Sequence, residues 1–388
     1  MLFRSAYILG ARQAVVGFDA RESSPEFAGA AIQGISDAGG DTLDLGLCGT
    51  EEVYFATGAR NADLGIMVTA SHNPISHNGL KLVGPAARPL SESEFAAIKE
   101  LTASGDFAPS TLIGTYQEGS LKARKAYMQH IQSLISIDQI GKVKIVFNCG
   151  NGAAGPTLRY LLDALAARGS QISSVLVQAD PDPSFPNGIP NPLLPENHGA
   201  TADAVRECGA DFGVAFDGDF DRCFLFDGEG KFVEGEYVVA LIAAAVLKDS
   251  PRATIVHDPR VVGAIDATVS KHGGQAVASK TGHAFVKATM RRAGAAYGGE
   301  MSAHHYFRDF FYCDSGMLPW LKVAELLGAT GQSLSQAIAE LRTDFPSSGE
   351  INFKVANKAA ALDRVRSALQ DKASKVDELD GLSLTFDT

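Results

Sequence analysis

The sequence predicts an α/β fold of three similar units in series, because a β-α-β order of segments begins three times along the chain. Its 388 residues are enough for about two to four domains of ordinary size. Hydrophobic residues make up 45% and charged residues 20%, which is typical of globular proteins. This composition excludes disordered, collagen-like and coiled-coil proteins.

The elements of the three units follow from short apolar runs and from segments with helical spacing. In the first unit, strands are expected at residues 14–18, 41–45 and 63–68, with a helix over 26–38. The second unit repeats this order, with strands at 142–147 and 172–178 around a helix over 156–167. The third unit has expected strands at 254–257 and near 276–278, and a helix that begins at residue 262.

Two further segments lie outside these repeats. Residues 91–118 are polar and interrupted by glycines, and a stretch with helical spacing follows over 121–134. After residue 349, a shorter segment contains an expected helix over 358–370 and an apolar, strand-like piece at 382–386. The sequence ends soon after that piece, so the fourth domain is expected to be truncated.

The charge and the cysteine content limit which partners the chain can bind and in which compartment of the cell it is expected. The 34 Lys and Arg residues against 45 Asp and Glu residues give a net charge of -11, which repels nucleic acid and anionic membranes. An anionic ligand therefore needs metal ions or local positive groups to hold it. The five cysteines have no spacing typical of a zinc site or a disulfide framework. The longest apolar run is about half of the roughly 20 residues that span a bilayer, and no signal-peptide core is present, so a cytoplasmic location is expected.

The first motif with chemistry is a strand that leads into a loop, GIMVTASHNP over residues 65–74. It presents Ser71 beside His72 at the carboxyl end of a strand, where α/β folds bind ligands. The loop continues to Lys81, whose ammonium could return to the serine. The alternatives are that Ser71 only starts a turn or caps a helix, and that Lys81 is a solvated surface lysine.

The second motif is DGDFDR over residues 217–222, directly after an apolar strand. Asp217, Asp219 and Asp221 repel one another unless a hard cation lies among them, and an all-oxygen set suits Mg²⁺. A calcium EF-hand loop is excluded, because Arg222 stands where such a loop needs glycine. Arg222 could complement a phosphate. The alternative is a solvated acidic turn.

The third motif is GGEMSAHHY over residues 298–306, expected after a small-residue strand at 293–297. Glu300, Ser302 and His304 are hydrogen-bonding groups of the kind that recognise sugar hydroxyls. The adjacent histidines could instead be metal ligands or structural residues.

Further polar side chains stand at other strand ends. Lys280 and His283 add a cation and a titratable ring. Arg21 adds a guanidinium in a loop between a strand and a helix.

One glycine-rich run points to a different class of enzyme. Residues 150–155, GNGAAG, fit the G-x-G-x-x-G pattern, follow a strand and open a helix, as in NAD-dependent dehydrogenases. Against that hypothesis, Asp180 lies in an extended turn some residues beyond the next strand, and the serine loop and the aspartates stay unexplained. The glycines then serve close packing of helix against strand.

Together, TASHNP at 69–74, DGDFDR at 217–222 and GEMSAH at 299–304 resemble the α-D-phosphohexomutase superfamily, and residues 300–320 resemble the bacterial phosphomannomutases in particular. The resemblance implies an α/β fold of three similar mixed-sheet domains and an incomplete α+β fourth domain around a central cleft. The expected domains follow in chain order: 1–118 with the phosphoserine loop, 119–231 with the metal-binding loop, 232–343 with the sugar-binding loop, and 344–388 as a truncated phosphate-binding domain.

The resemblance also implies a role for each motif. Ser71 would carry the transferable phosphoryl group, and Asp217, Asp219 and Asp221 would hold Mg²⁺ together with a phosphoserine oxygen. Glu300 and Ser302 would bind sugar hydroxyls. The groups expected to contact phosphate, bind substrate or transfer protons are Arg21, Lys81, Arg222, Lys280, His283 and His304.

The implied activity is the interconversion of hexose 1-phosphate and hexose 6-phosphate, with mannose phosphates as the expected pair, for the synthesis of GDP-mannose and polysaccharide. Phosphorylated Ser71 would donate to a small-molecule sugar phosphate, and a hexose 1,6-bisphosphate would serve as intermediate and activator. The family's phosphate-gripping loop would lie beyond Thr388, so reduced or absent turnover is expected. A sugar-phosphate-binding fragment without activity therefore stays open as an alternative, as do glucose in place of mannose, the general base among Lys81, His283 and His304, and the oligomeric state.

Overall fold

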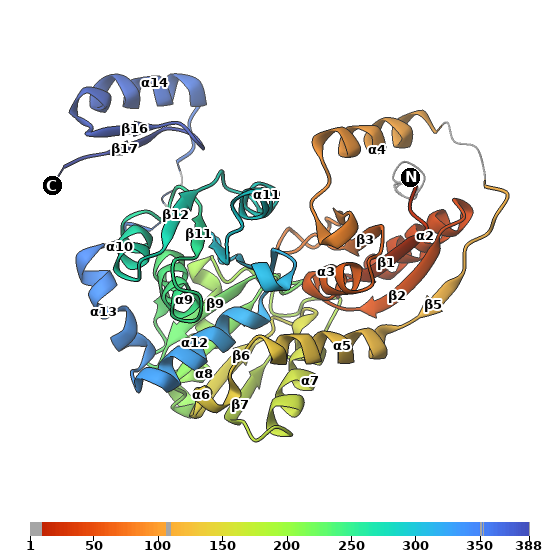
Figure 1. Ribbon diagram of the computed structural model, residues 1–388, viewed down its shortest axis with the longest axis horizontal. Helices are drawn as coiled ribbons and strands as arrows, with labels where there is room; N and C mark the ends of the chain where they lie inside the picture. Colours follow the sequence, from red (N-terminus) through yellow and green to blue (C-terminus); the bar gives the residue numbers. More distant parts are fainter. Residues whose placement is uncertain (1–9, 106–109, 350, 352, 388) are drawn as a thin grey trace.

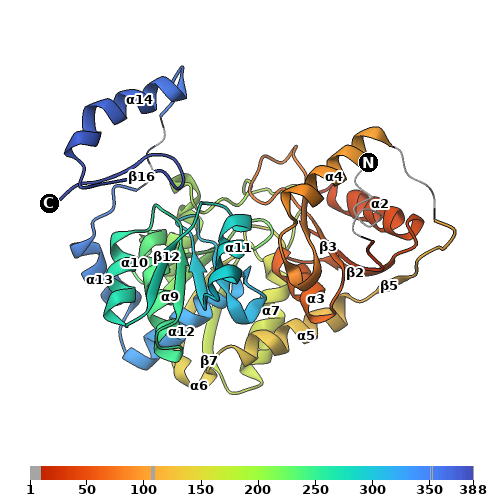
Figure 2. The same cartoon turned by 45° about the horizontal axis from the view of Figure 1, so that its top comes forward.

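The computed structural model describes residues 10–105, 110–349, 351 and 353–387, and it confirms the predicted α/β fold. Three five-stranded sheets follow one another along the chain, and each is accompanied by helices. In Figures 1 and 2 the first sheet lies to one side of the molecule, while the second and third sheets lie close together on the other. A small unit near the C-terminus lies beyond the third sheet and meets its unit where the Thr281 amide donates to Asp380 Oδ2 at 3.0 Å.

The first sheet has the order β4-β3-β1-β2-β5. Its strands are β1 (Gln13–Phe18), β2 (Asp41–Leu47), β3 (Leu64–Val68), β4 (Leu80–Val83) and β5 (Tyr116–Glu118), and its helices are α2 (Ser24–Asp37), α3 (Thr50–Ala59), η1 (Pro85–Ala87) and α4 (Glu92–Ser104). Successive residues of β1 point to opposite faces. Val16 therefore packs with Ile35 of α2, whereas Val15 packs with Val53 of α3, so that helices cover both faces.

The second sheet has the order β10-β9-β8-β6-β7. Its strands are β6 (Lys142–Asn148), β7 (Gln171–Val177), β8 (Phe212–Phe216), β9 (Cys223–Asp227) and β10 (Phe232–Val233), and its helices are α5 (Ser120–Ser133), α6 (Ile137–Ile140), α7 (Ala154–Ala166), η2 (Pro195–Asn197) and α8 (Gly199–Cys208). All residues of β8 and β9 are buried.

The third sheet has the order β12-β11-β13-β14-β15. Its strands are β11 (Thr254–His257), β12 (Gln275–Ala278), β13 (Tyr297–Gly299), β14 (His305–Phe307) and β15 (Cys313–Asp314), and its helices are α9 (Gly235–Asp249), α10 (Gly263–Lys271), α11 (His283–Ala293), η3 (Arg308–Phe310), α12 (Met317–Thr330) and α13 (Leu334–Asp344). The small C-terminal unit consists of α14 (Lys358–Leu369), η4 (Gln370–Lys372), β16 (Lys375–Asp377) and β17 (Ser383–Thr385).

The three sheets repeat one topology. In each, the first strand lies between the second and third strands and pairs with both in parallel, and a fourth strand returns antiparallel to the third. The connection from the third to the fourth strand therefore holds the equivalent position in each unit. These connections are residues 69–79, 217–222 and 300–304, which contain the three motifs of the sequence.

The units are joined by a continuous core. Trp320 of α12, which follows the third sheet, is fully buried and packs edge-on against Phe147 of β6 with ring centroids 4.8 Å apart. Tyr54 and Phe55 of α3, from the first unit, belong to the same cluster of buried residues. Within the described part of the chain, no helix has the length and apolar character that crossing a bilayer requires.

One helix was not predicted from the sequence, and one strand begins later than expected. The polar stretch 91–118 contains α4, which Ser91 caps by accepting a hydrogen bond from the Glu94 amide at 3.2 Å. The strand expected at 293–297 begins only at Tyr297, as β13, because α11 extends to Ala293 and ends at Gly294 in the left-handed conformation.

The glycine-rich run at 150–155 packs against protein backbone. A Cβ atom at Gly155 would lie 1.7 Å from the carbonyl oxygen of Ala179, and one at Gly152 would lie 2.6 Å from that of Gly218. The glycines thus allow α7 to approach the turn after β7 and allow the acidic loop to approach the start of α7. This accounts for the run without a dinucleotide.

We predict that Gly155→Ala destabilises the chain by about 2 kcal/mol or more, because the added methyl group overlaps a backbone oxygen that cannot move freely. Gly29→Ala in α2 is the matched control. No atom lies within 4 Å of its added Cβ, so a gain of up to about 1 kcal/mol is expected from helix propensity. Thermal unfolding followed by circular dichroism compares the two. Equal unfolding temperatures of Gly155→Ala and wild type would contradict the close packing.

Candidate active site

The three motif loops meet at one place. The Ser71 hydroxyl donates a hydrogen bond to Asp217 Oδ2 at 2.6 Å, which joins the loop after β3 to the loop after β8. Arg222 forms an isolated antiparallel bridge with His304, and His304 Nε2 lies 3.6 Å from Asp221 Oδ1. The structure thus brings together side chains that the sequence separates by as many as 233 residues, from Ser71 to His304.

Ser71 is held in an unusual backbone conformation. Its φ angle is +51°, in the left-handed region that side chains other than glycine rarely adopt. Its amide donates to Thr69 Oγ1 at 2.8 Å, and the Thr69 hydroxyl in turn donates to Asp19 Oδ2 at 2.7 Å. These bonds fix the serine with its hydroxyl toward the acidic loop.

Arg21 has a position different from the expected phosphate contact. Its guanidinium is buried and donates to the carbonyl oxygens of Ser71 at 2.8 Å, Asn73 at 2.7 Å, Pro74 at 3.0 Å and His77 at 3.1 Å. Both terminal nitrogens are therefore used to hold the serine loop, because this loop turns its backbone oxygens inward. In the structure Arg21 positions Ser71 through the backbone.

The acidic loop between β8 and β9 has the donor set of a cation site. Asp217, Asp219 and Asp221 are each at most 1% exposed, and one carboxylate oxygen from each lies within 4.8 Å of the others. Oδ1 of each aspartate accepts no hydrogen bond from any described residue. Buried carboxylate oxygens without partners are costly, and an all-oxygen set of this kind fits a hard divalent cation.

Lys81 enters the acidic loop from β4. Its ammonium donates to Asp219 Oδ2 at 2.6 Å and forms a shorter contact with Asp221 Oδ2. Burial alone would lower the pKa of Lys81, but the facing carboxylates, with Asp219 and Asp221 foremost, raise it above the ordinary value. Lys81 is therefore a permanent cation at neutral pH, suited to neutralise charge and unsuited to accept a proton.

Two aspartates of the loop differ in acidity. Burial, together with the charges of Asp221 and Asp219, raises the pKa of Asp217 to about 7. Burial also acts to raise the pKa of Asp221, but Lys81 and His304 outweigh it and hold that pKa well below the usual range. The proton shared with Ser71 therefore lies beside the more basic of these two carboxylates.

Arg222 and His72 flank the serine. Arg222 Nε lies 3.7 Å from Asp217 Oδ2 and has no hydrogen-bond partner among the described residues. His72 Nδ1 lies 3.1 Å from Ser71 Oγ, and burial and the nearby Arg222 lower the pKa of His72 to about 4. A guanidinium with free donors beside a serine hydroxyl is suited to bind phosphate oxygens.

In the third loop, the side chains of Ser302 and His304 are more exposed to solvent than that of Glu300. Glu300 is 1% exposed; its Oε1 accepts from the Gly282 amide at 2.6 Å, and its Oε2 accepts a short hydrogen bond from Tyr306. Ser302 Oγ lies 3.2 Å from His304 Nδ1. The loop thus orients His304 through Ser302.

Lys280 and His283 lie in and after the neighbouring loop, at exposed positions. His283 is the first residue of α11, and Lys280 Nζ lies 5.9 Å from the centre of the Phe285 ring. The Gly282 amide is the link between this segment and Glu300.

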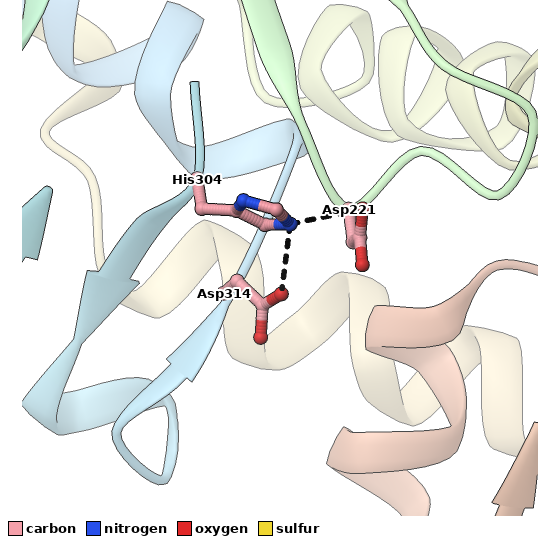
Figure 3. Close-up of side chains that lie close together, drawn as sticks. All are labelled: Asp221, His304 and Asp314. Carbon is pink, nitrogen blue, oxygen red and sulfur yellow. Dashed lines mark ion pairs between the residues drawn. The ribbon is translucent and has the colours of Figure 1, made fainter. Parts of the chain in front are cut away.

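Two buried charged residues at the site, Asp314 and Lys287, were not predicted from the sequence. Figure 3 shows His304 between two carboxylates, with Nε2 3.6 Å from Asp221 Oδ1 and 3.9 Å from Asp314 Oδ2. Lys287 is fully buried, with Nζ 2.5 Å from Asp314 Oδ1 and 3.9 Å from the centre of the Tyr54 ring. Helical spacing places Lys287 beside Val286 and Met290 on the apolar face of α11, which could have marked it as a buried lysine.

Three family models match the chain. They describe the α/β/α domains I, II and III of phosphoglucomutase/phosphomannomutase and match residues 3–109, 125–230 and 234–345. Each match contains the four strands of the repeated topology and one of the three motif loops.

Known proteins match over almost the whole chain. A phosphomannomutase of Salmonella montevideo is 50% identical over 375 residues, which covers 96% of this chain and 82% of that protein. A phosphomannomutase of Escherichia coli strain K12 is 48% identical with the same coverage. The crystal structure of a phosphoglucomutase/phosphomannomutase family protein from Burkholderia thailandensis superposes with a TM-score of 0.84 at 28% identity, covering 99% of this chain and 83% of that one. The chain therefore belongs to the phosphoglucomutase/phosphomannomutase family.

Proposed function

We propose that the chain is a phosphohexomutase that interconverts mannose 1-phosphate and mannose 6-phosphate, with Ser71 as the carrier of the phosphoryl group. Identity of about half with phosphomannomutases over 96% of the chain supports the reaction and favours it over a dehydrogenase. The observation that carries the role of Ser71 is the hydrogen bond that its hydroxyl donates to Asp217 at 2.6 Å. Lys81 of β4 and Arg222 of the acidic loop bring positive charge to the same loop.

The proposed reaction consists of two phosphoryl transfers. In the first, O6 of mannose 1-phosphate attacks the phosphorus of phosphorylated Ser71, an O6–P bond forms and the Oγ–P bond breaks. The O6 proton passes to a side-chain base, and the Ser71 oxygen recovers a proton. The mannose 1,6-bisphosphate then turns over, its 1-phosphate returns to Ser71 by the same steps in reverse, and mannose 6-phosphate leaves. The enzyme is unchanged at the end.

The side chains act mainly by placing positive charge around the moving phosphoryl group. Arg222 offers free donors beside Ser71, and protonated Lys81 compensates Asp219 and Asp221. A bound Mg²⁺ ion, held by Asp217, Asp219 and Asp221, would neutralise charge on the phosphoryl oxygens. Such charge placement, with alignment of the two oxygens, is the larger part of catalysis in phosphoryl transfer.

His304 is the proposed proton carrier for the sugar hydroxyl. The raised pKa of Lys81 argues against it as the base, and His283 lies at an exposed position in the first turn of α11. His304 is oriented by Ser302 at 3.2 Å, and its ring nitrogens lie 3.6 to 3.9 Å from carboxylate oxygens of Asp221, Glu300 and Asp314. Glu300 and Ser302 are the proposed contacts to sugar hydroxyls.

A hexose 1,6-bisphosphate is the proposed activator. An unphosphorylated Ser71 cannot start the cycle with a monophosphate, because the first transfer needs a phosphoryl group on the enzyme. A bisphosphate bound in the same place donates one group to Ser71 and leaves as a monophosphate. The small molecule that enters the site is therefore a sugar phosphate in each step.

We predict that Ser71→Ala lowers turnover by at least about a thousandfold, because the phosphoryl carrier is lost and no neighbouring group replaces a nucleophile that acts covalently. Ser76→Ala, an exposed serine of the same loop, is the matched control and is expected to retain the wild-type rate. A coupled assay with mannose 1-phosphate, Mg²⁺ and mannose 1,6-bisphosphate measures both. Turnover by Ser71→Ala at the control's rate would exclude a phosphoserine at this position.

We predict that Asp219→Asn raises the Mg²⁺ concentration needed for half-maximal activity by about tenfold or more and lowers the maximal rate, because one anionic ligand is lost. Asp203→Asn, which changes an exposed side chain of α8, serves as the control and is expected to leave the Mg²⁺ titration unchanged. The measurement is the rate as a function of Mg²⁺ concentration. An Asp219→Asn titration that superposes on that of wild type would remove Asp219 from the proposed ligand set.

A further inference from the structure

We propose that Thr50 is a positioning residue for the cation site, because its hydroxyl fixes the carboxylate of Asp219; this inference rests on the proposed function of the acidic loop. Thr50 is the first residue of α3 and belongs to the first sheet unit, whereas Asp219 belongs to the second. Thr50 Oγ1 donates to Asp219 Oδ2 at 2.5 Å. The Thr50 amide donates to the Asp219 carbonyl oxygen at 3.1 Å.

The two contacts hold both the backbone and the side chain of Asp219. Asp219 Oδ2 accepts from Thr50 at 2.5 Å and from Lys81 at 2.6 Å, whereas Oδ1 accepts from no described residue. Rotation of the carboxylate would break both bonds in a fully buried place, which is costly. The hydrogen bonds from Thr50 and Lys81 to Oδ2 therefore determine that Oδ1 is the oxygen of Asp219 that stays free for a cation.

The position of Thr50 is fixed by the two residues that follow it in α3, Glu51 and Glu52. The Glu51 carboxylate accepts from the amides of Gly316 and Met317 at 3.2 Å each, at the start of α12 in the third unit. The Glu52 carboxylate accepts from Thr157 Oγ1 at 2.8 Å in the second unit. Three consecutive residues of α3 thus bind the second and third units, so the position of Thr50 follows from how the units dock.

The hydroxyl of Thr50 has a different hydrogen-bond acceptor from the one that a buried helical threonine commonly has. Buried threonines in helices commonly donate to a carbonyl of the preceding turn, and Thr57 of the same helix does so, to Val53 at 2.7 Å. Thr50 has no preceding helical turn, and its hydroxyl bonds to the acidic loop instead. Thr57 is equally buried, which makes it a matched control.

The test is the affinity for Mn²⁺, added alone to the unphosphorylated full chain and measured by titration calorimetry. Thr50→Val, which removes the hydroxyl and keeps the shape, is expected to weaken Mn²⁺ binding by about tenfold or more, as loss of a group that orients a ligand commonly does. Thr50→Ser, which keeps the hydroxyl, is expected to restore most of the affinity. Thr57→Val is expected to bind as wild type does.

Thr50→Ala removes the same hydroxyl without placing a methyl group against Asp219 and is measured beside Thr50→Val, with circular dichroism to verify folding. Wild-type affinity in the folded variants that lack the hydroxyl would overturn the role of Thr50 and leave the proposed cation site intact. An equal loss in Thr57→Val would also overturn it, because the effect would then follow from any change in α3. An absence of Mn²⁺ binding by the wild-type chain would overturn the cation site itself.

Discussion

The mutual repulsion of three buried carboxylates is the constraint on which the rest of the site depends. Asp217, Asp219 and Asp221 have oxygens within 4.8 Å of one another and almost no exposure to water. Such a group is stable only if positive charge and hydrogen-bond donors surround it. Lys81 comes from the first unit, Arg222 from the second and His304 from the third, so the compensation is shared among the three units.

This constraint explains why the units are packed so closely around the loop. Glycines of the first and third units allow this close approach at Phe220: a Cβ at Gly49 would lie 2.1 Å from the Phe220 ring, and one at Gly316 would lie 2.4 Å from the Phe220 carbonyl oxygen. Trp320 packs against Phe147 in the buried core that joins the second and third units. The electrostatic centre and the apolar core therefore depend on the same docking, and the phosphoryl chemistry proposed for Ser71 follows from it.

Much of the fold could be predicted from the sequence, because the strands are short apolar runs that either alternate with period two or are fully buried, as β3 at Leu64–Val68 is. The missed helix α4 has one buried residue, Ile98, so that no apolar stripe indicated it. The three motif loops were also found, since polar groups at strand ends stand out from the pattern. Lys287 and Asp314 were missed because their pairing depends on distances across the third sheet. Arg21 was found as a charge in the right loop, but only the folded backbone reveals that its donors hold carbonyl oxygens.

The most direct test of this account is to locate the phosphoryl group itself. The chain is incubated with mannose 1,6-bisphosphate with and without Mg²⁺, and the phosphorylated residue is identified by peptide mass spectrometry. The account predicts phosphate on Ser71, with loading that depends on Mg²⁺. Phosphate on another residue, or none on Ser71 when Mg²⁺ and bisphosphate are both present, would contradict the central claim that the acidic loop serves a phosphoserine at this position.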